Sequence, residues 1–544
     1  MKIGEYLIKQ VLATGTQHVF GIQGDYVLNF YAQLCKSPLK VINTCNEEGA
    51  GFAADAYARV KGFGVVCVTY GVGGLKLANS TAQAFAEISP VLVISGAPGM
   101  AERRHNPLLH HKVRSFETQL NVFREMTVAQ AVLGDAKTAA AEIQRVIDVI
   151  KEIKRPGYIE LPRDMVDVDI CEPQVPVSGE SSDLDRPAID EALREVLGML
   201  AAAKRPIIIA GVEINRFGLQ ALFLKFLERS GLPFVTGVLG KSVVSESHPH
   251  FIGVYAGGMS PEDVREAVED SDCVIAVGPY VTDLATGIFT HHIDIAQSIV
   301  MAPDKISVKH HSYPEVGMKY FLESLVAAIP KTPKKIRQPK KYELSPFIYQ
   351  KGSKITVNRL FACLNTFLDD NTTVIAEPGD SLFGSLDLRV HGMAEFLSPA
   401  YYASLGFSVP ASIGVQLAAA HRRPLVLVGD GAFQMSGMEL SVSVRYGLSP
   451  IVVILDNGGY GTFRPMLNGS FNDIQPWQYA DIVKVIGGGK GYTVSTEDEL
   501  ISALEAARKN DSFPTIIDVR LEKYDCSDRL KKLSGKLKKQ VKQQ

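Results

Sequence analysis

Two short motifs in the last third of the chain carry side chains that could bind a metal ion. Gly429-Asp430-Gly431 ends one apolar run, 425–428, and after 24 further residues Asp456-Asn457 ends another, 451–455. Such runs predict buried parallel strands, whose carboxyl ends meet at the edge where open α/β sheets bind ligands. Carboxylate and amide oxygens suit Mg²⁺, which needs few protein ligands when a diphosphate supplies the others. The sequence therefore predicts a magnesium–diphosphate site, with glycines that let the backbone approach the diphosphate closely.

These motifs also have an ordinary explanation, because Gly-Asp turns are common at the ends of strands. Taken alone, the first motif is a weak signal. Its spacing from the second motif and the apolar context of both favour a ligand site over two unrelated turns.

Over nearly its whole length the chain resembles the thiamine-diphosphate-dependent 2-oxo acid decarboxylases, the pyruvate and indolepyruvate decarboxylase family. Besides the two motifs above, Asn46-Glu47 with 50–55 resembles the family's catalytic-glutamate segment, and Leu108-Leu109-His110-His111 resembles its paired-histidine motif. The segments 377–383 and 471–473 look most similar to those of bacterial phenylpyruvate decarboxylases.

The resemblance implies roles for residues of the last third. Asp430, the Asn457 side chain and the Gly459 carbonyl would bind Mg²⁺. Leu405 would be the apolar wedge that bends the cofactor, and the Ala403 carbonyl would accept a hydrogen bond from its aminopyrimidine ring. The other cofactor contacts implied are Gly429, Gly431, Ala432, Phe433 and Tyr460. Asp380 aligns beside the diphosphate, but its negative charge argues against that place.

The resemblance implies further that four residues of the first third take part in catalysis. As a carboxylic acid, Glu47 would hydrogen-bond the aminopyrimidine ring, a task that needs a water-poor site and a raised pKa. Glu48 does not match and should point elsewhere. Asp25, His110 and His111 would handle protons near the substrate, which suits histidine because it titrates near neutral pH. Judged alone, Glu47 is a solvated carboxylate at a helix start, and the two histidines are surface residues or a chance metal pair.

One position departs from the family pattern. Many members have a glutamate six residues beyond the metal-binding asparagine, where this chain has Phe463. The change removes a charge and adds apolar area, so it favours a large apolar substrate side chain over pyruvate. The neighbouring Thr462 is expected in the same pocket, and Asp283 of the middle region is a further candidate for it.

Strands alternate with helical stretches along the whole chain, which predicts parallel sheets with helical crossovers. Proline-rich and polar breaks near 172–188 and 331–348 divide the chain. We therefore expect an α/β protein of three doubly wound parallel-sheet domains. By the resemblance these are a pyrimidine-binding domain at 1–172, a middle domain at 188–330 and a diphosphate-binding domain at 349–544.

Composition excludes several classes of protein. The net charge of −2 invites neither nucleic acid nor a membrane, and no apolar run is long enough to cross one. Seven scattered cysteines without a CxxC pair indicate neither a disulfide framework nor a zinc site. The basic tail 529–544 is expected to be a solvated helix rather than a nucleic-acid arm. With no signal-peptide pattern at the N-terminus, the expected location is cytoplasmic.

The expected activity is non-oxidative decarboxylation of an aromatic or bulky 2-oxo acid, phenylpyruvate or indole-3-pyruvate, to an aldehyde and CO₂. Decarboxylation of pyruvate or of a branched-chain 2-oxo acid remains an alternative, as does an acetolactate-synthase-like carboligase, although the histidine pair argues against the latter. A catalytically idle binding homologue and a dinucleotide-dependent oxidoreductase are weaker alternatives. The resemblance implies a homodimer at minimum and a homotetramer by expectation, with thiamine diphosphate between the first domain of one copy and the last domain of another.

Overall fold

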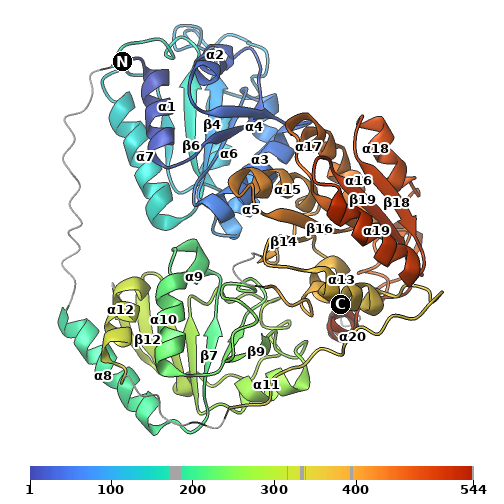
Figure 1. Ribbon diagram of the computed structural model, residues 1–544. Helices are drawn as coiled ribbons and strands as arrows, with labels where there is room; N and C mark the ends of the chain where they lie inside the picture. Colours follow the sequence, from blue (N-terminus) through green and yellow to red (C-terminus); the bar gives the residue numbers. More distant parts are fainter. Residues whose placement is uncertain (171–185, 315, 331–335, 337, 392–395, 542–544) are drawn as a thin grey trace.

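The computed structural model describes the chain except residues 171–185, 315, 331–335, 337, 392–395 and 542–544, and the described part forms three α/β domains in chain order (Figure 1). The first sheet is parallel throughout, in the order β2-β1-β3-β4-β6-β5. Its strands are β1 (His18–Ile22), β2 (Lys40–Asn43), β3 (Gly64–Val68), β4 (Val91–Ala97), β5 (Gln130–Val132) and β6 (Gly157–Pro162).

The middle sheet has the order β13-β12-β11-β10-β7-β8-β9. Its strands are β7 (Pro206–Ala210), β8 (Phe234–Thr236), β9 (Phe251–Val254), β10 (Cys273–Val277), β11 (Ser298–Met301), β12 (Lys305–Val308) and β13 (His311–Pro314). The expected parallel core is present, but β12 and β13 extend it as antiparallel strands. The connections 302–304 and 309–310 are too short for the crossover that a parallel pair requires.

The last sheet is again parallel, in the order β15-β14-β16-β17-β19-β18. Its strands are β14 (Thr372–Ala376), β15 (Phe396–Leu397), β16 (Arg423–Gly429), β17 (Ile451–Asp456), β18 (Lys490–Val494) and β19 (Thr515–Arg520). β16 and β17 are neighbours, with Gly429 opposite Leu455. The prediction that the two motifs meet at one carboxyl edge is therefore confirmed.

Helices pack around these sheets. In the first domain they are α1 (Ile3–Ala13), α2 (Leu28–Lys36), α3 (Glu47–Lys61), α4 (Val72–Lys76), α5 (Ala78–Ala86), α6 (Thr118–Arg124) and α7 (Ala139–Ile153). In the middle domain they are α8 (Arg186–Ala202), α9 (Glu213–Arg216), α10 (Gln220–Ser230), α11 (Glu262–Glu269) and α12 (Met318–Ala328). In the last domain they are α13 (Val357–Phe367), α14 (Asp380–Ser385), α15 (Ser408–Ala418), α16 (Asp430–Ser436), α17 (Leu440–Tyr446), α18 (Ile482–Val485), α19 (Glu497–Lys509) and α20 (Asp528–Val541). Among the described residues, no helix is both long and apolar enough to span a membrane.

The first and last domains contact each other through α3 and α15, which lie side by side (Figure 1). Helix α3 begins after Asn46, whose side chain accepts a hydrogen bond from the Gly49 amide (2.9 Å), an N-cap that satisfies one free N–H group. A Cβ at Gly414 of α15 would lie 2.0 Å from the Ala53 carbonyl oxygen of α3. Only glycine therefore permits this close crossing of the two helices.

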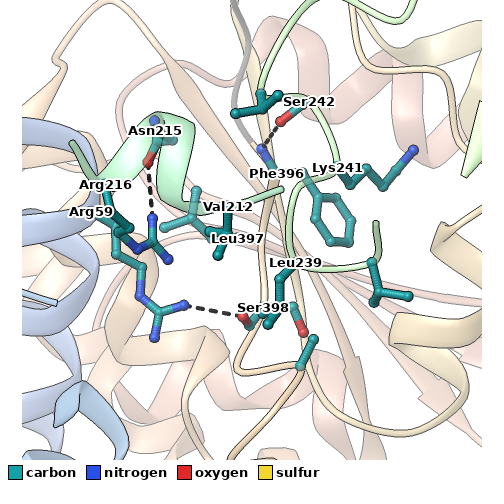
Figure 2. A pocket seen from close by; sticks show the side chains of 13 residues that line it. Arg59, Val212, Asn215, Arg216, Leu239, Lys241, Ser242, Phe396, Leu397 and Ser398 are labelled. Carbon is teal, nitrogen blue, oxygen red and sulfur yellow. Dashed lines mark hydrogen bonds between the residues drawn. The ribbon is translucent and has the colours of Figure 1, made fainter. Parts of the chain in front are cut away.

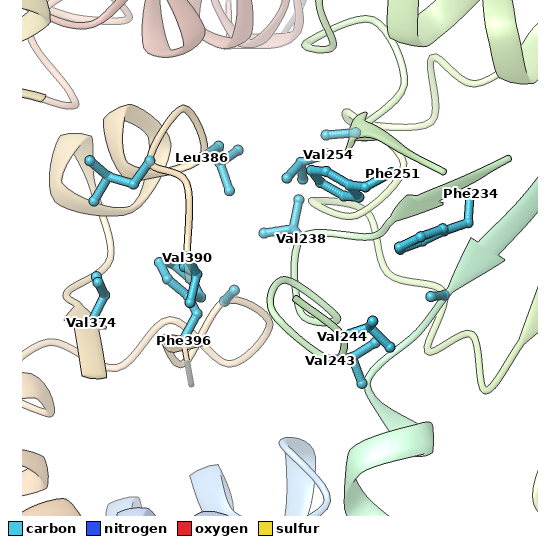
Figure 3. Packing of buried hydrophobic residues seen from close by; sticks show 14 of the residues in the cluster. Phe234, Val238, Val243, Val244, Phe251, Val254, Val374, Leu386, Val390 and Phe396 are labelled. Atoms are coloured by element: carbon cyan, nitrogen blue, oxygen red, sulfur yellow. The ribbon is translucent and has the colours of Figure 1, made fainter. Parts of the chain in front are cut away.

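The middle and last domains share one apolar core. Figure 3 shows middle-domain side chains such as Val238 and Phe251 facing Leu386 and Val390 of the last domain. Where all three domains meet, a water-sized cavity of about 30 Å³ remains (Figure 2). Beside it Arg59 of the first domain donates a hydrogen bond to the Ser398 carbonyl of the last (3.1 Å). Apolar packing thus joins the middle and last domains, and this hydrogen bond is one of the contacts between the first and last.

The tail is a helix, as expected, but its first turns are not solvated. Leu530 and Leu533 of α20 are buried, because their spacing places both on one face of the helix. Arg529 pairs with Asp387 (2.7 Å) and donates a hydrogen bond to the Met259 carbonyl (2.9 Å). Helix α20 thus ties the last domain to the middle one.

The three sheets fall within the predicted ranges 1–172, 188–330 and 349–544. Residues 172–185 of the first predicted linker and residues 331–335 and 337 of the second lie outside the described residues, so the boundaries themselves stay a prediction.

Candidate active site

A cavity of about 340 Å³ opens at the carboxyl edge of the last sheet, where β16 and β17 end. Most of the residues that the sequence analysis assigned to cofactor, metal and substrate line it. These are Ala403, Leu405, Gly429, Asp430, Gly431, Ala432, Asn457, Gly459, Tyr460, Thr462 and Phe463. The structure therefore places three segments, 403–405, 429–432 and 457–463, around one space.

Asp430 is buried at the start of α16. One carboxylate oxygen accepts a hydrogen bond from the Gly431 amide (2.8 Å), and the other accepts from the amides of Gly458 (2.7 Å) and Gly459 (2.9 Å). Burial raises the pKa of Asp430 to about 7, while the amide hydrogen bonds act in the opposite direction. A divalent cation at this carboxylate would favour the ionised form.

Asn457 offers an oxygen that nothing in the described structure satisfies. Its Oδ1 atom is buried and has no hydrogen-bond partner, and an unsatisfied buried acceptor costs about 1–3 kcal/mol. A Cβ at Gly429 would meet no atom within 4 Å, so there is free space above this glycine in the cavity wall. The oxygen donors of Asp430 and Asn457 fit Mg²⁺, and the space at Gly429 fits the diphosphate of a cofactor.

The loop that carries Ala403 and Leu405 is held by a residue to which the sequence analysis gave no role. Glu377 follows β14, is fully buried, and accepts hydrogen bonds from the amides of Gly406 (2.7 Å), Phe407 (3.3 Å) and Ser408 (2.8 Å). These amides form the start of α15, where the helix dipole favours an anion. Burial raises the pKa of Glu377, and the hydrogen bonds oppose the rise. In the sequence, Glu377 could have been noticed as an acid directly after the apolar run that forms β14.

The residues assigned to the first domain form a second group, at the carboxyl edge of its own sheet. The imidazole Nε2 of His110 lies 2.7 Å from an Asp25 carboxylate oxygen, and the His110 ring stacks on Tyr26 with ring centroids 4.7 Å apart. Ligand atoms of Asp25, His110 and His111 all lie within 4.8 Å of one another. Arg163 adds a cation 3.6 Å from Asp25. The sequence-predicted proton-handling cluster is therefore assembled within this chain.

Glu47 is the first residue of α3 and lies beside that cluster. The start of α4 lies between the two: a Cβ at Gly73 would lie 3.5 Å from a Glu47 carboxylate oxygen, and a Cβ at Gly71, just before the helix, would lie 2.7 Å from the His111 Cβ. Glu47 pairs with Lys76 at 3.0 Å, and its side chain is 13% exposed. Glu48 points elsewhere, as expected, and accepts a hydrogen bond from the Asn79 side chain (2.7 Å).

One chain does not bring the two groups into a single cavity. The described residues that line the space at Asp430 come from the last domain and, for Leu284, from the middle domain. None comes from the first domain, so Glu47, Asp25, His110 and His111 lie outside it. Each chain thus carries two separate groups of candidate residues, called half-sites below, each at the carboxyl edge of its own sheet.

Two of the expected residues, Phe433 and Asp283, are not among the described residues that line this cavity, whereas Asp380 borders it. Phe433 does not line it, because its side chain is buried in the core against Tyr479. Asp283 does not line it either: its carboxylate accepts a hydrogen bond from the Leu284 amide (2.7 Å), and Leu284 is the lining residue. Asp380 does border the cavity, but its carboxylate accepts hydrogen bonds from the backbone amide (2.8 Å) and the hydroxyl of Ser527. Burial raises the pKa of Asp380 to about 6.

The sequence analysis missed several apolar residues of the cavity wall. They are Leu284, Phe383, Met466, Cys526 and Leu533. Leu284 belongs to the middle domain and Leu533 to α20, so both reach the cavity only through the packing of distant segments. The apolar spacing of Leu530 and Leu533 was the one signal that the tail packs against something.

Comparison with known proteins agrees with this architecture. Three family models match the chain: thiamine pyrophosphate enzyme N-terminal TPP binding domain at residues 1–119, central domain at 193–329 and C-terminal TPP binding domain at 381–519. The chain is 34% identical to an indole-3-pyruvate decarboxylase of Azospirillum brasilense, with 97% of each chain covered. It is 31% identical to pyruvate decarboxylase 1 of Pisum sativum, with 97% of this chain and 92% of the relative covered. It is also 31% identical to an alpha-keto-acid decarboxylase of Mycobacterium leprae, with 96% and 93% covered. The chain therefore belongs to the thiamine-diphosphate-dependent 2-oxo acid decarboxylases.

Proposed function

We propose that the protein decarboxylates an aromatic or bulky 2-oxo acid, phenylpyruvate or indole-3-pyruvate, to the corresponding aldehyde and CO₂. The observation that carries this proposal is Phe463, which lies in the cavity wall. By the family resemblance, a glutamate would be expected at this position. Leu284, Phe383, Met466 and Leu533 add apolar surface to the same wall. Such a wall favours an apolar side chain, because an apolar group gains free energy when it leaves water.

The residues of the cavity fit the cofactor as follows. Asp430, Asn457 and the Gly459 carbonyl would hold Mg²⁺ with the diphosphate, and Ala403 and Leu405 would hold the rest of the cofactor in its bent shape. Bound thiamine diphosphate supplies the nucleophilic carbon that adds to the 2-oxo group and takes up the electrons released with CO₂. Glu47 would hold a proton at the aminopyrimidine ring, and Asp25, His110 and His111 would deliver the proton that completes the aldehyde.

This assignment needs two copies of the chain, since the two half-sites do not meet within one. We propose that the first domain of one copy closes the cavity in the last domain of the other, in a dimer or a tetramer of two such dimers. Apolar side chains beside the first half-site support this: Val72 is 55% exposed and Leu108 is 94% exposed. These side chains would leave water if a second copy covered this half-site, which would stabilise the assembly. The molar mass of the purified protein in solution checks the assembly.

The substrate class is tested by measuring aldehyde formation from a panel of 2-oxo acids with thiamine diphosphate and Mg²⁺ supplied. We expect kcat/KM for phenylpyruvate to exceed that for pyruvate on the order of 10²-fold, because each methylene-sized apolar contact contributes ~1–3 kcal/mol of discrimination. Pyruvate and branched-chain acids are the alternative substrates. A higher kcat/KM for either would contradict the aromatic preference and leave decarboxylation itself in place.

Phe463→Glu is expected to lower kcat/KM for phenylpyruvate more than for pyruvate. An ionised carboxylate is costly to desolvate against an aromatic ring, whereas a small substrate leaves room for water beside it. The measurement is kcat/KM for both acids with both proteins. Phe471→Glu is the matched control, because Phe471 is 65% exposed and is not among the residues lining the cavity. Equal losses for the two substrates would remove Phe463 from the specificity argument.

Glu377→Gln is expected to loosen the loop that carries Ala403 and Leu405. The amide nitrogen cannot accept a hydrogen bond, so at least one of the three backbone N–H groups loses its acceptor, at about 1–3 kcal/mol of unfolding free energy. We expect a higher half-saturating cofactor concentration as well. Glu497→Gln is the control, because Glu497 is a buried glutamate of the same domain that pairs with Arg359 and is absent from the cavity wall. Unchanged cofactor saturation in Glu377→Gln would show that the loop does not depend on this carboxylate.

A further inference from the structure

A buried carboxylate of the last domain holds the turn that carries Glu47. Glu439, only 1% exposed, accepts hydrogen bonds from the Cys45 amide (3.0 Å), the Asn46 amide (3.1 Å) and the Asn46 side-chain amide (3.0 Å). A Cβ at Gly49 would lie 2.3 Å from a Glu439 oxygen. The carboxylate therefore packs directly against the start of α3, which Glu47 begins.

The same turn is held at its other end by the last domain. The Asn43 amide donates to the Tyr446 hydroxyl (3.1 Å), which in turn donates to the Val41 carbonyl (3.3 Å). The backbone of residues 41–46, which leads into Glu47, is therefore held by Tyr446 of α17 and by Glu439 of the short 3₁₀ helix Gly437–Glu439. Burial raises the pKa of Glu439 to about 7, and the amide hydrogen bonds oppose that rise.

Glu439 is also connected to the metal-binding half-site of its own chain. Helix α16 begins at Asp430 and ends at Ser436, and the 3₁₀ helix with Glu439 follows without a gap. Asp430 thus begins the first of these two consecutive helices and Glu439 ends the second; the two meet at Ser436 (φ −140°), and α17 follows at Leu440. In the proposed dimer, these two residues of one chain serve different active sites.

We propose that Glu439 is a positioning residue that acts through Glu47 of its own chain, so that the last domain of each copy aligns the acid serving the cofactor bound on the other copy. The inference rests on the proposed function, because it requires the two-copy active site. A general structural role would not distinguish the two active sites of the dimer. This proposal states that a change at Glu439 affects the active site that uses Glu47 of the same chain.

Glu439→Gln is expected to lower kcat between tenfold and a hundredfold, since a misplacement of about 1 Å can cost 10²-fold in rate. Cofactor affinity, measured by titration calorimetry, should stay within a few-fold of the parent, because Asp430 and Asn457 are untouched. Glu497→Gln is again the control for removing a buried glutamate. A parallel loss of cofactor affinity and rate, or an unchanged kcat, would overturn the positioning role.

Hybrid dimers, made by co-expressing two differently tagged chains, decide which site is affected. In the first arrangement, one copy carries both Glu439→Gln and Glu47→Gln, and the other copy is unchanged. The remaining Glu47 then belongs to the unchanged copy, which also keeps its Glu439. We expect the rate of this hybrid to equal that of a Glu47→Gln/parent hybrid. With the two substitutions on different copies, the only Glu47 present lacks its Glu439, and the rate should fall to the level of the Glu439→Gln site. Equal rates in the two arrangements, or the reverse order, would overturn the inference.

A reference hybrid separates failure of this inference from failure of the proposed function. Glu47→Gln on one copy and Asp430→Ala on the other should restore one working site, and no restored activity would overturn the two-copy site and the inference with it. If Glu439→Gln does not fold, Tyr446→Phe serves in the same two arrangements, because it loses the hydrogen bond that the phenol donates to Val41. The expected order of rates is the same, with a smaller difference, and equal rates again overturn the inference.

Discussion

Glu47→Gln is expected to leave the fold intact and to lower kcat by about 10²-fold or more, the usual contribution of a positioned acid or base. The amide keeps the shape of the side chain, but its N–H is not acidic and cannot transfer a proton to the cofactor's ring nitrogen. Little stability should be lost with the carboxylate, because its partner Lys76 is 58% exposed and a solvated ion pair contributes about 0–1 kcal/mol. The measurements are kcat at saturating cofactor and the melting temperature.

Glu48→Gln is the matched control for this experiment. Glu48 is the adjacent acid of the same helix turn, but it bonds to Asn79 rather than facing Gly73 and the histidine cluster. We expect its kcat within a few-fold of the parent. A Glu47→Gln protein that binds cofactor and works within a few-fold of the parent would show that Glu47 is not the acid.

Asp430→Ala is expected to act mainly on cofactor affinity. Removing one of the few protein oxygens available to Mg²⁺ should weaken cofactor binding by about 10²-fold or more, since even the loss of a residue that only supports a metal ligand costs 10–100-fold. Activity should then depend steeply on added Mg²⁺ and thiamine diphosphate. Three backbone amides also lose their acceptor, so the loop at Gly458 and Gly459 should become less ordered.

Titration calorimetry with thiamine diphosphate and Mg²⁺ measures this affinity directly. Asp369→Ala is the control, because Asp369 lies in the turn before β14, at the opposite edge of the same sheet, where its carboxylate accepts a hydrogen bond from the Asn371 amide (3.0 Å). Its affinity should match that of the parent protein. Unchanged affinity in Asp430→Ala would contradict the metal assignment.

The sequence alone determined the architecture and the main part of the cofactor cavity. The apolar runs before Gly429 and Asp456 predicted β16 and β17, because a strand buried on both faces needs a continuous apolar run. Their carboxyl ends had to meet once the strands paired as parallel neighbours. Asp430 and Asn457 could therefore be placed from local pattern, and the resemblance to the family supplied their roles.

The tertiary structure decided which neighbours of these residues reach the cavity. Phe433 follows Ala432 in the sequence, yet Ala432 lines the cavity while Phe433 packs in the core. Leu284 rather than Asp283 faces it for the same reason: the direction of a side chain in a loop or first helix turn depends on packing, which a local pattern does not encode. Leu533 enters the wall only because α20 packs back onto the domain.

Tertiary structure alone also revealed the long-range hydrogen bonds of Glu377 and Glu439. Each carboxylate accepts backbone N–H groups from a segment far away in the sequence, Glu377 from 406–408 and Glu439 from 45–46. Sequence pattern predicts elements well because hydrophobic periodicity is local. It does not predict which buried acid will meet which free amides, because that depends on how separate elements are packed. Both acids hold segments that carry proposed cofactor residues, so these long-range hydrogen bonds link the fold of the protein to its proposed chemistry.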